Sequence, residues 1–354
     1  MSASLTAEQR DLRDAVRGLL ARESGDSSWR RLCREIGVAG LGLPERFGGA
    51  GAGAAETGVV MEELGRDLTC SPMLGSAVLA AQALLASGDE APCARLLPPI
   101  ATGSVTAALA WTTRAGHWDP GEVACQARTD SGEIWVLDGE AHYVLDGETA
   151  DVLLVAARGP AGTGLFEVAP GQGGVRRAAA VTMDASRRLA VVRLAGARGR
   201  RVGGDATGAL RRARDLACLA LGTEQVGAAR RALDLTVRYA LTRVQFGQVI
   251  GGFQALRHRM ADLHVLVESA RSLARAAAAA ADDGAPDLGL RAAAVKVYCS
   301  DALTQTADQM IQLHGAIGIT WEHPAHRYLR RAHGARHLFG SPDRHAAALA
   351  ARLL

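Results

Sequence analysis

Apolar residues recur at helical spacing through the first part of the chain. In residues 5–37 they mark one face of a helical pattern that Thr6 can cap, and an Ala/Leu-rich pattern covers residues 71–101, where Pro98-Pro99 is expected to end it. The glycine-rich segment GGAGAG between them lacks the Gly-Lys-Ser/Thr ending of a phosphate-binding P-loop and follows no clear strand. The pattern predicts an N-terminal helical domain over residues 1–104, with this segment as a connecting loop.

The period changes from helical to alternating near residue 105. Apolar side chains then lie two residues apart in short segments, and turn pairs such as Asp138-Gly139 and Asp146-Gly147 separate these segments. This alternation predicts a small antiparallel β domain over residues 105–207. We expect it to end in the basic sequence ARGRRVGGDATG as a solvated linker.

The helical period returns after Gly208 and continues to the last residues. Four long helices are predicted, over residues 209–242, 254–282, 288–317 and 326–352. They form a C-terminal four-helix bundle over residues 208–354. The order of helical domain, β domain and helical bundle predicts an α+β fold.

The segment Arg243–Asp262, RVQFGQVIGGFQALRHRMAD, joins the first two helices of that bundle. A basic residue precedes the pair Phe246-Gly247, and the diglycine Gly251-Gly252 interrupts the helical pattern before it resumes. A cation held at a junction between helices suits a ligand that carries phosphate. We therefore expect an anion site at a helical hinge.

Composition narrows the class of protein. Hydrophobic residues make up 48% of the 354 residues, and 40 Lys+Arg stand against 37 Asp+Glu, so the net charge of +3 argues against a nucleic-acid partner. The six cysteines are far apart, without the spacing of a zinc site or a disulfide scaffold, so no metal is expected. The first residues lack the apolar core of a signal peptide, and no stretch suits a membrane span. A cytoplasmic protein is expected.

Several motifs then occur in a specific order. They are LGLPERFGG, EELGR, RVQFGQVIGGFQALRHRMAD and QLHGAIGITWEHPAHRYLRR. Together with the domain order they resemble the acyl-CoA dehydrogenase family over essentially the whole chain, most strongly in the C-terminal bundle. The resemblance implies a tetramer that binds FAD and acyl-CoA, removes the α-hydrogen as a proton and the β-hydrogen as a hydride to the flavin, and uses an electron-transfer flavoprotein as acceptor.

In that family the FAD site is shared between two subunits, and the half that one subunit donates to its neighbour is present here. The resemblance implies that Arg243 meets the FAD pyrophosphate and that Phe246 and Gln254 lie beside the adenosine. The Q-x-x-G-x-x-G segment brings backbone close to the same cofactor. Its residues here are Gln312, His314, Gly315 and Gly318, and Ala316 stands where a second glycine is usual.

The half of the site that a subunit builds for its own flavin departs from the family pattern. Thr112 and Thr113 match, but the Glu and the Gly-Ser-Asp of the usual strand and loop are absent from AWTTRAGHWDPGE. In the next hairpin, His142 replaces a lysine, and Tyr143-Val144-Leu145-Asp146 replaces a run whose hydroxyl bonds the flavin. A leucine side chain cannot supply that hydrogen bond.

The two positions where the family carries its catalytic base hold apolar residues. The alignment places Phe339 at the common position and Ala217 at the alternative one on the preceding helix. Neither side chain can accept a proton. Asp343, Glu224 and His337 are chemically able to substitute.

The sequence therefore favours the non-catalytic partner in an α₂β₂ heterotetramer with a second acyl-CoA dehydrogenase-like subunit. Two alternatives stay open: a self-sufficient homotetramer with an unrecognised base, and a flavin-free scaffold of the same fold. We also expect Arg327, Arg330 and Arg331 to form a solvated basic face, and Trp111, Trp118, Trp135 and Trp321 to be packing aromatics.

Overall fold

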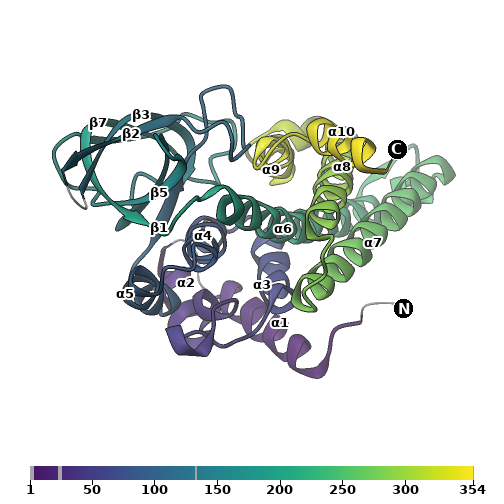
Figure 1. The fold of residues 1–354 in the computed structure, drawn as a ribbon. Coiled ribbons are helices and arrows are strands. Elements are labelled where there is room, and N and C mark those ends of the chain that lie inside the picture. Colours follow the sequence, from purple (N-terminus) through teal and green to yellow (C-terminus); the bar gives the residue numbers. More distant parts are fainter. Residues whose placement is uncertain (1–3, 23–25, 132–133, 354) are drawn as a thin grey trace.

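The computed structural model describes residues 4–22, 26–131 and 134–353 (Figure 1). The N-terminal helices are α1 (Ala7–Leu20), α2 (Asp26–Arg31), α3 (Ala54–Arg66), α4 (Ala81–Ala86) and α5 (Glu90–Ala101), with a π-helical segment at Met73–Ala80. Thr6 caps α1 as predicted: its hydroxyl accepts a hydrogen bond from the backbone N–H of Gln9 at 3.1 Å, and the Gln9 side chain accepts one from the N–H of Thr6.

The prolines expected to end this region lie inside a helix. Pro98 and Pro99 belong to the last turn of α5, and the carbonyl of Pro98 still accepts a hydrogen bond from the N–H of Thr102. A proline removes only its own N–H and disturbs the turn before it, so its carbonyl can still support the following residues. The helical region therefore ends at residue 101 as predicted, but Pro98-Pro99 lies inside its last turn and does not mark the end.

The middle of the chain forms a seven-stranded sheet. Its strands are β1 (Ala107–Ala110), β2 (Cys125–Ser131), β3 (Ile134–Leu145), β4 (Val152–Gly159), β5 (Gly162–Val168), β6 (Val175–Ala179) and β7 (Leu189–Val202). The order is β1-β4-β2-β3-β7-β5, and β5 also pairs with β4, so five strands close on themselves. Most pairs are antiparallel as predicted, but β1–β4 and β2–β4 are parallel.

The expected linker is partly a strand. Residues 197–202 belong to β7, where Arg198 pairs with Val136 of β3 and Val202 with Leu165 of β5. Ala197 and Val202 are buried while Arg198 is exposed, so buried and exposed side chains alternate over a short part of this basic sequence, as in a strand. The expectation of a solvated loop was wrong for this part because the arginines hide that alternation.

The C-terminal helices are α6 (Thr207–Thr242), α7 (Gln254–Asp282), α8 (Leu288–His314), α9 (Ala325–His337) and α10 (Pro342–Leu353). The predicted helix 326–352 is thus two helices. Phe339 and Gly340 adopt positive φ values of 62° and 104° between them, and Pro342 disfavours helical backbone at the residue before it. We call residues 338–341 the elbow.

Helix α6 runs from the sheet through the centre of the molecule, with the N-terminal helices on one side and α8 on the other (Figure 1). Its contact with α3 is backbone to backbone: a Cβ at Gly65 would overlap the carbonyl of Glu224, and one at Gly227 would overlap the carbonyl of Glu62. Across the described helices, no segment is both long and apolar enough to cross a bilayer. No group of potential metal ligands gathers among the described residues.

Candidate functional site

The end of α6 carries an exposed hairpin with an unusual tip. The backbone N–H of Arg243 donates to the carbonyl of Tyr239 at 2.8 Å and ends the helix, and strands β8 (Val244–Gln245) and β9 (Gln248–Val249) follow. At the tip, Phe246 has a φ of +53°, and its side chain is 92% exposed. Gly247 also has a positive φ, so the pair forms a tight turn in which a phenylalanine is strained. Gln254, at the start of α7, is exposed as well.

The end of α8 lies beside this hairpin. The ring of Tyr239 stacks on His314 with 4.4 Å between centroids, and the Tyr239 hydroxyl donates to the carbonyl of His314 at 3.4 Å. Gly315 then turns the chain with a φ of +64°, and Gln312, Gly315 and Ala316 are exposed. The structure thus brings the end of α6 to the end of α8, although Arg243 and Gln312 are 69 positions apart in the sequence. Tyr239 makes the contact that sequence reasoning missed.

Two of the predicted cofactor residues at this turn are buried. His314 is 4% exposed; its Nδ1 donates to the carbonyl of Met310 at 2.7 Å, and its buried Nε2 has no hydrogen-bond partner among the described residues. Burial lowers the pKa of His314, so the ring is neutral near pH 7. Gly318 is buried, and a Cβ there would press on the Cβ of His314 at 3.2 Å. His314 and Gly318 therefore pack beneath the turn and are not exposed at its surface.

Thr112 and Thr113 stand in a different place, just after β1. Thr112 is 2% exposed, and its carbonyl accepts from the N–H of His142 at 2.9 Å. The Thr113 hydroxyl accepts from the N–H of His117 at 3.4 Å. A cavity of about 560 Å³ opens nearby, between the β domain and the C-terminal helices, and its described lining includes Trp118, Tyr143 and Arg187 but neither threonine.

The hairpin and this cavity are far apart within one chain. Arg214 of α6 donates to the carbonyl of Trp118 at 3.5 Å, which fixes the cavity beside the first third of that helix. Arg243 lies roughly eight turns further along, or about 40 Å at a rise of about 1.5 Å per residue. That separation is longer than one dinucleotide cofactor spans. The hairpin and the cavity of a single chain therefore cannot hold the same cofactor.

Both expected base positions are filled by packing. Phe339 is 1% exposed, and its ring meets Trp118 edge to face at 5.0 Å, while Trp118 meets Trp111 in the same way at 5.6 Å. Ala217 is fully buried in α6. Trp111 and Trp118 are packing aromatics as predicted, and Trp135 packs on Phe166 at 5.4 Å. Trp321 is not, because it is 79% exposed.

The three candidate substitutes differ in position. Asp343 lies in the first turn of α10, and His337 ends α9; both are exposed and line the cavity. Burial lowers the pKa of His337. Glu224 is 4% exposed, and Arg187 Nη2 binds its Oε1 at 2.6 Å and its Oε2 at 2.8 Å, so it is not free to abstract a proton.

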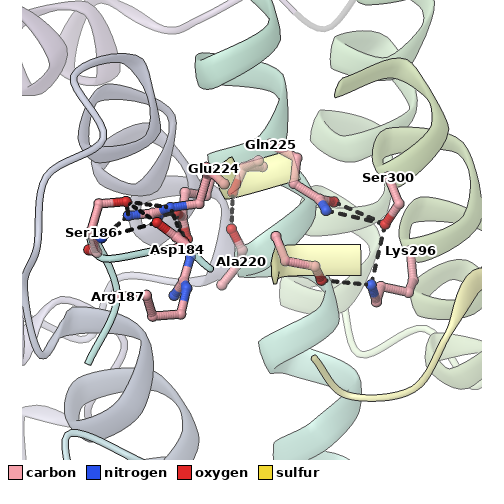
Figure 2. Close-up of polar contacts among 11 residues, drawn as sticks. Asp184, Ser186, Arg187, Ala220, Glu224, Gln225, Lys296 and Ser300 are labelled. Atoms are coloured by element: carbon pink, nitrogen blue, oxygen red, sulfur yellow. Dashed lines mark hydrogen bonds and ion pairs between the residues drawn. The ribbon is translucent and has the colours of Figure 1, made fainter. Parts of the chain in front are cut away.

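Glu224 belongs to a buried ionic network that sequence reasoning missed. Arg331 pairs with Glu224 and, at 2.9 Å from Nε to Oδ2, with Asp184, while Ser186 bridges the same groups (Figure 2). Arg331 is 2% exposed, so its assignment to a solvated basic face was wrong. Burial raises the pKa of Glu224, but Arg187 and Arg331 outweigh it and hold the pKa below its ordinary value. The network joins the loop before β7, α6 and α9.

A second polar cluster lies on the other side of α6. Lys296 of α8 is fully buried, and its Nζ donates to the carbonyls of Ala335 at 3.1 Å and Arg336 at 2.8 Å, and to Ser300 Oγ at 3.2 Å (Figure 2). It therefore caps the last turn of α9 just before the elbow. His345 of α10 donates from Nε2 to the carbonyl of Phe339 at 2.9 Å. The two contacts fix the elbow that presents Phe339 to Trp118.

Comparisons with known proteins agree with this arrangement. The family models for the acyl-CoA dehydrogenase N-terminal and C-terminal domains match residues 6–104 and 206–354. The acyl-CoA dehydrogenase IpdE2 of Mycobacterium tuberculosis is 39% identical over 331 residues, which cover 93% of this chain and 87% of that protein.

Two solved assemblies share the fold. A chain of the ChsE4-ChsE5 complex from Mycobacterium tuberculosis is 28% identical with a TM-score of 0.88, over 100% of this chain and 99% of that one. A chain of the Tcur3481-Tcur3483 steroid ACAD is 30% identical with a TM-score of 0.87, over 97% of both chains. On the matched domains, the relatives and the fold, this chain belongs to the acyl-CoA dehydrogenase family.

Proposed function

We propose that this chain is the non-catalytic subunit of a heterotetrameric FAD-dependent acyl-CoA dehydrogenase, and that it donates contacts to a flavin held mainly by a partner subunit. The observation that carries the proposal is Phe339, a buried aromatic where the family has its base, packed on Trp118. The distance of about 40 Å along α6 between the hairpin and the cavity supports the narrower point that the hairpin serves a flavin of another subunit, in a homotetramer as in a heterotetramer.

The donated half fits FAD. Arg243 is exposed and has no ion-pair partner among the residues that the structure describes, so its charge is available to a pyrophosphate. Phe246 offers an exposed ring, and the glycine turn after His314 lets backbone approach a ligand. When bound, the flavin supplies the acceptor for the hydride that leaves the acyl β-carbon.

The half beside the chain's own cavity fits FAD poorly. Leu145, which replaces the hydroxyl-bearing residue of the family pattern, is 3% exposed, and Thr112 is 2% exposed. Trp118 lines the cavity, and Phe339, at the family's base position, packs behind it and does not line the cavity. The partner subunit must therefore supply the base and the flavin ring pocket.

The substrate proposed is an acyl-CoA thioester with a steroid-derived acyl group, and the acceptor is an electron-transfer flavoprotein. The name of the 30%-identical steroid ACAD supports the acyl group. The two neighbours that are named as pairs, ChsE4-ChsE5 and Tcur3481-Tcur3483, support a second, different subunit.

The test is to express the chain alone and together with a homologous chain that carries the base. We expect the single chain to be colourless and the pair to hold one FAD for every two chains. Arg243→Ala should weaken FAD binding by the pair at least tenfold, because it removes one charge-assisted contact of about 1.5–3 kcal/mol. Arg238→Ala, about one turn earlier in α6, is the control and should leave FAD binding unchanged. A single chain that binds one FAD and oxidises an acyl-CoA would contradict the proposal.

One observation favours the rival reading of a self-sufficient homotetramer: Asp343 and His337 both line the cavity. If the chain alone proves active, Asp343→Asn should abolish turnover without loss of bound flavin. Under the proposed function the same substitution leaves the activity of the pair unchanged.

A further inference from the structure

Three aromatic rings lie one against the next where the end of α6 meets the end of α8. The ring of His314 lies between the other two, with 4.4 Å to the centroid of Tyr239 and 4.3 Å to the centroid of His323. His323 belongs to the loop between the 3₁₀ helix Gly315–Ile319 and α9, and it is half-buried. We call Tyr239, His314 and His323 the ring stack.

The ring stack joins the two turns that the proposed function assigns to FAD. The carbonyl of Tyr239 accepts a hydrogen bond from the N–H of Arg243 at 2.8 Å, and its hydroxyl donates to the carbonyl of His314 at 3.4 Å. Gly315 follows His314 directly with a φ of +64° and begins the glycine turn, residues 315–318. A displacement of His314 therefore displaces the start of that turn.

The hydrogen bonds of the two histidines require neutral rings. The Nδ1–H of His314 donates to the carbonyl of Met310, and its buried Nε2 has no hydrogen-bond partner within the described part of the chain. Nδ1 of His323 accepts from the backbone N–H of Ala325 at 3.3 Å, at the start of α9. A protonated histidine has two N–H donors and no acceptor. A proton would therefore add an unpaired buried donor to His314, or would remove the acceptor of His323.

The ionisable groups around His323 come from three helices and its own loop. They are Tyr239 of α6, His314 of α8, Glu322 of the loop, and His326, Arg327 and Arg330 of α9. Burial lowers the pKa of His323, and the charges of His314 and His326 lower it further. Glu322 is exposed, where an ion pair contributes little. These surroundings favour the neutral form of His323.

We propose that His323 is a positioning residue for the half of the FAD site that this chain donates. Its neutral ring holds His314 against Tyr239 and keeps the glycine turn in the shape that the cofactor meets. Protonation of His323 releases the turn and lowers the affinity for FAD. The inference rests on the proposed function for the contact between this turn and FAD.

The direction of the pH effect follows from the difference between the two states of the turn. When the turn is released, His323 has its ordinary pKa of about 6.5, and in the ring stack the pKa is lower. Below about pH 6.5 the released state therefore binds a proton that the stacked state does not, and acid favours release. Above that pH the affinity for FAD is constant.

The first experiment separates the ring of His323 from its hydrogen bond. His323→Phe keeps a ring but cannot accept from Ala325, whereas His323→Asn keeps an acceptor but has no ring. Hydrogen exchange of the full chain without flavin at pH 7.5 should be faster over residues 310–320 in His323→Asn, and His323→Phe should restore the slower rate. Unchanged exchange over residues 217–229, in the buried part of α6, reports an intact fold.

The opposite order, with slow exchange in His323→Asn and fast exchange in His323→Phe, would mean that His323 acts only as a cap of α9. That result overturns the proposal. Equal exchange over residues 310–320 in both variants and the wild type overturns it as well, because the ring would then not hold the turn.

The second experiment measures FAD affinity of the assembled pair between pH 5.5 and 8. At pH 7.5, His323→Asn should weaken FAD binding roughly fivefold, as expected for one aromatic contact, and His323→Phe should recover most of the loss. Below about pH 6.5 the affinity of the wild type falls by up to about tenfold per pH unit, and His323→Phe makes this fall shallower. His333→Asn, at an exposed histidine of α9, is the matched control and changes neither property.

The two experiments separate this inference from the proposed function. Faster exchange in His323→Asn beside an unchanged FAD affinity overturns the role of the turn in FAD binding, and a fall as steep in His323→Phe as in the wild type overturns the protonation step. If the chain binds FAD and is active without a partner, the proposed function fails. The variants then keep the same order of FAD affinity in the assembly of identical chains.

Discussion

Two phenylalanines occupy the same uncommon backbone region in opposite surroundings. Phe339 has a φ of +62° and is 1% exposed, whereas Phe246 has a φ of +53° and is 92% exposed. A side chain in this region costs roughly 1–2 kcal/mol. At Phe339 burial on Trp118 offsets that cost, but Phe246 meets only the edge of Phe253 at 6.2 Å. No comparable packing among the described residues therefore offsets the backbone strain at Phe246, which is consistent with a contact to a partner.

The pair gives a matched prediction at the scale of single residues. Phe339→Ala should lower the free energy of unfolding by about 3–5 kcal/mol, because it leaves a cavity beside Trp118. Phe246→Ala should change it by less than about 0.5 kcal/mol, since the ring is exposed. Urea unfolding followed by tryptophan fluorescence measures both. A loss at Phe339→Ala as small as the one expected for Phe246→Ala would show that Phe339 is not a core residue.

His345 predicts how the elbow responds to acid. Burial lowers the pKa of His345 to about 4, Lys296 and Arg214 add to the shift, and the hydrogen bond to Phe339 opposes it. Between pH 6.5 and 4 the unfolded chain binds a proton that the folded chain does not, so this contribution is complete above pH 6.5 and is lost as the pH falls towards 4. The slope approaches about 1.4 kcal/mol per pH unit.

His345→Gln should flatten this part of the pH dependence, because glutamine can donate to the same carbonyl but does not titrate. Urea unfolding at pH 7, 5.5 and 4.5 compares the variant with the wild type, and the other buried histidines are present in both. If the difference between the two proteins stays constant across these pH values, His345 does not titrate as described.

At the scale of elements, the close approach of α3 and α6 depends on Gly65 and Gly227. Gly65→Ala should cost several kcal/mol, because the new Cβ overlaps the backbone of Glu224 and the two helices must separate. Gly18→Ala in α1 has nothing within 4 Å and should stabilise the chain by roughly 0.5–1 kcal/mol through helix propensity. Thermal unfolding of the two variants tests the opposite signs. A Gly65→Ala protein as stable as the wild type would mean that the helices are not in backbone contact.

At the scale of the whole molecule, the network around Glu224 connects the β domain to the helical bundle. Arg331→Met leaves Glu224 and Asp184 with one cation fewer in a buried site, which should cost about 3–5 kcal/mol. Arg327→Met, on the exposed face of the same helix, should be nearly neutral. Hydrogen exchange should show faster opening of the loop before β7 in Arg331→Met only. Unchanged exchange there would mean that the network does not hold the two parts together.

The order of helices and strands followed from periodicity, since long helices such as α6 and α7 repeat the signal over many turns. The elbow could not be predicted from periodicity, because a positive φ at Phe339 does not change the spacing of apolar residues. The pairing of Arg331 with Glu224 joins residues 107 positions apart and is visible only once the fold places them together. The apolar residues at the two family base positions could be read from the sequence, but the packing of Phe339 on Trp118 could not.

The separation of the hairpin and the cavity along α6 implies that FAD binding depends on the protein concentration. If each flavin is held by surfaces from different chains, cofactor loading and subunit assembly are one mass-action equilibrium, and each stabilises the other. Dilution would then release flavin, and excess FAD would drive association. The yellow colour of such a preparation would report the degree of assembly.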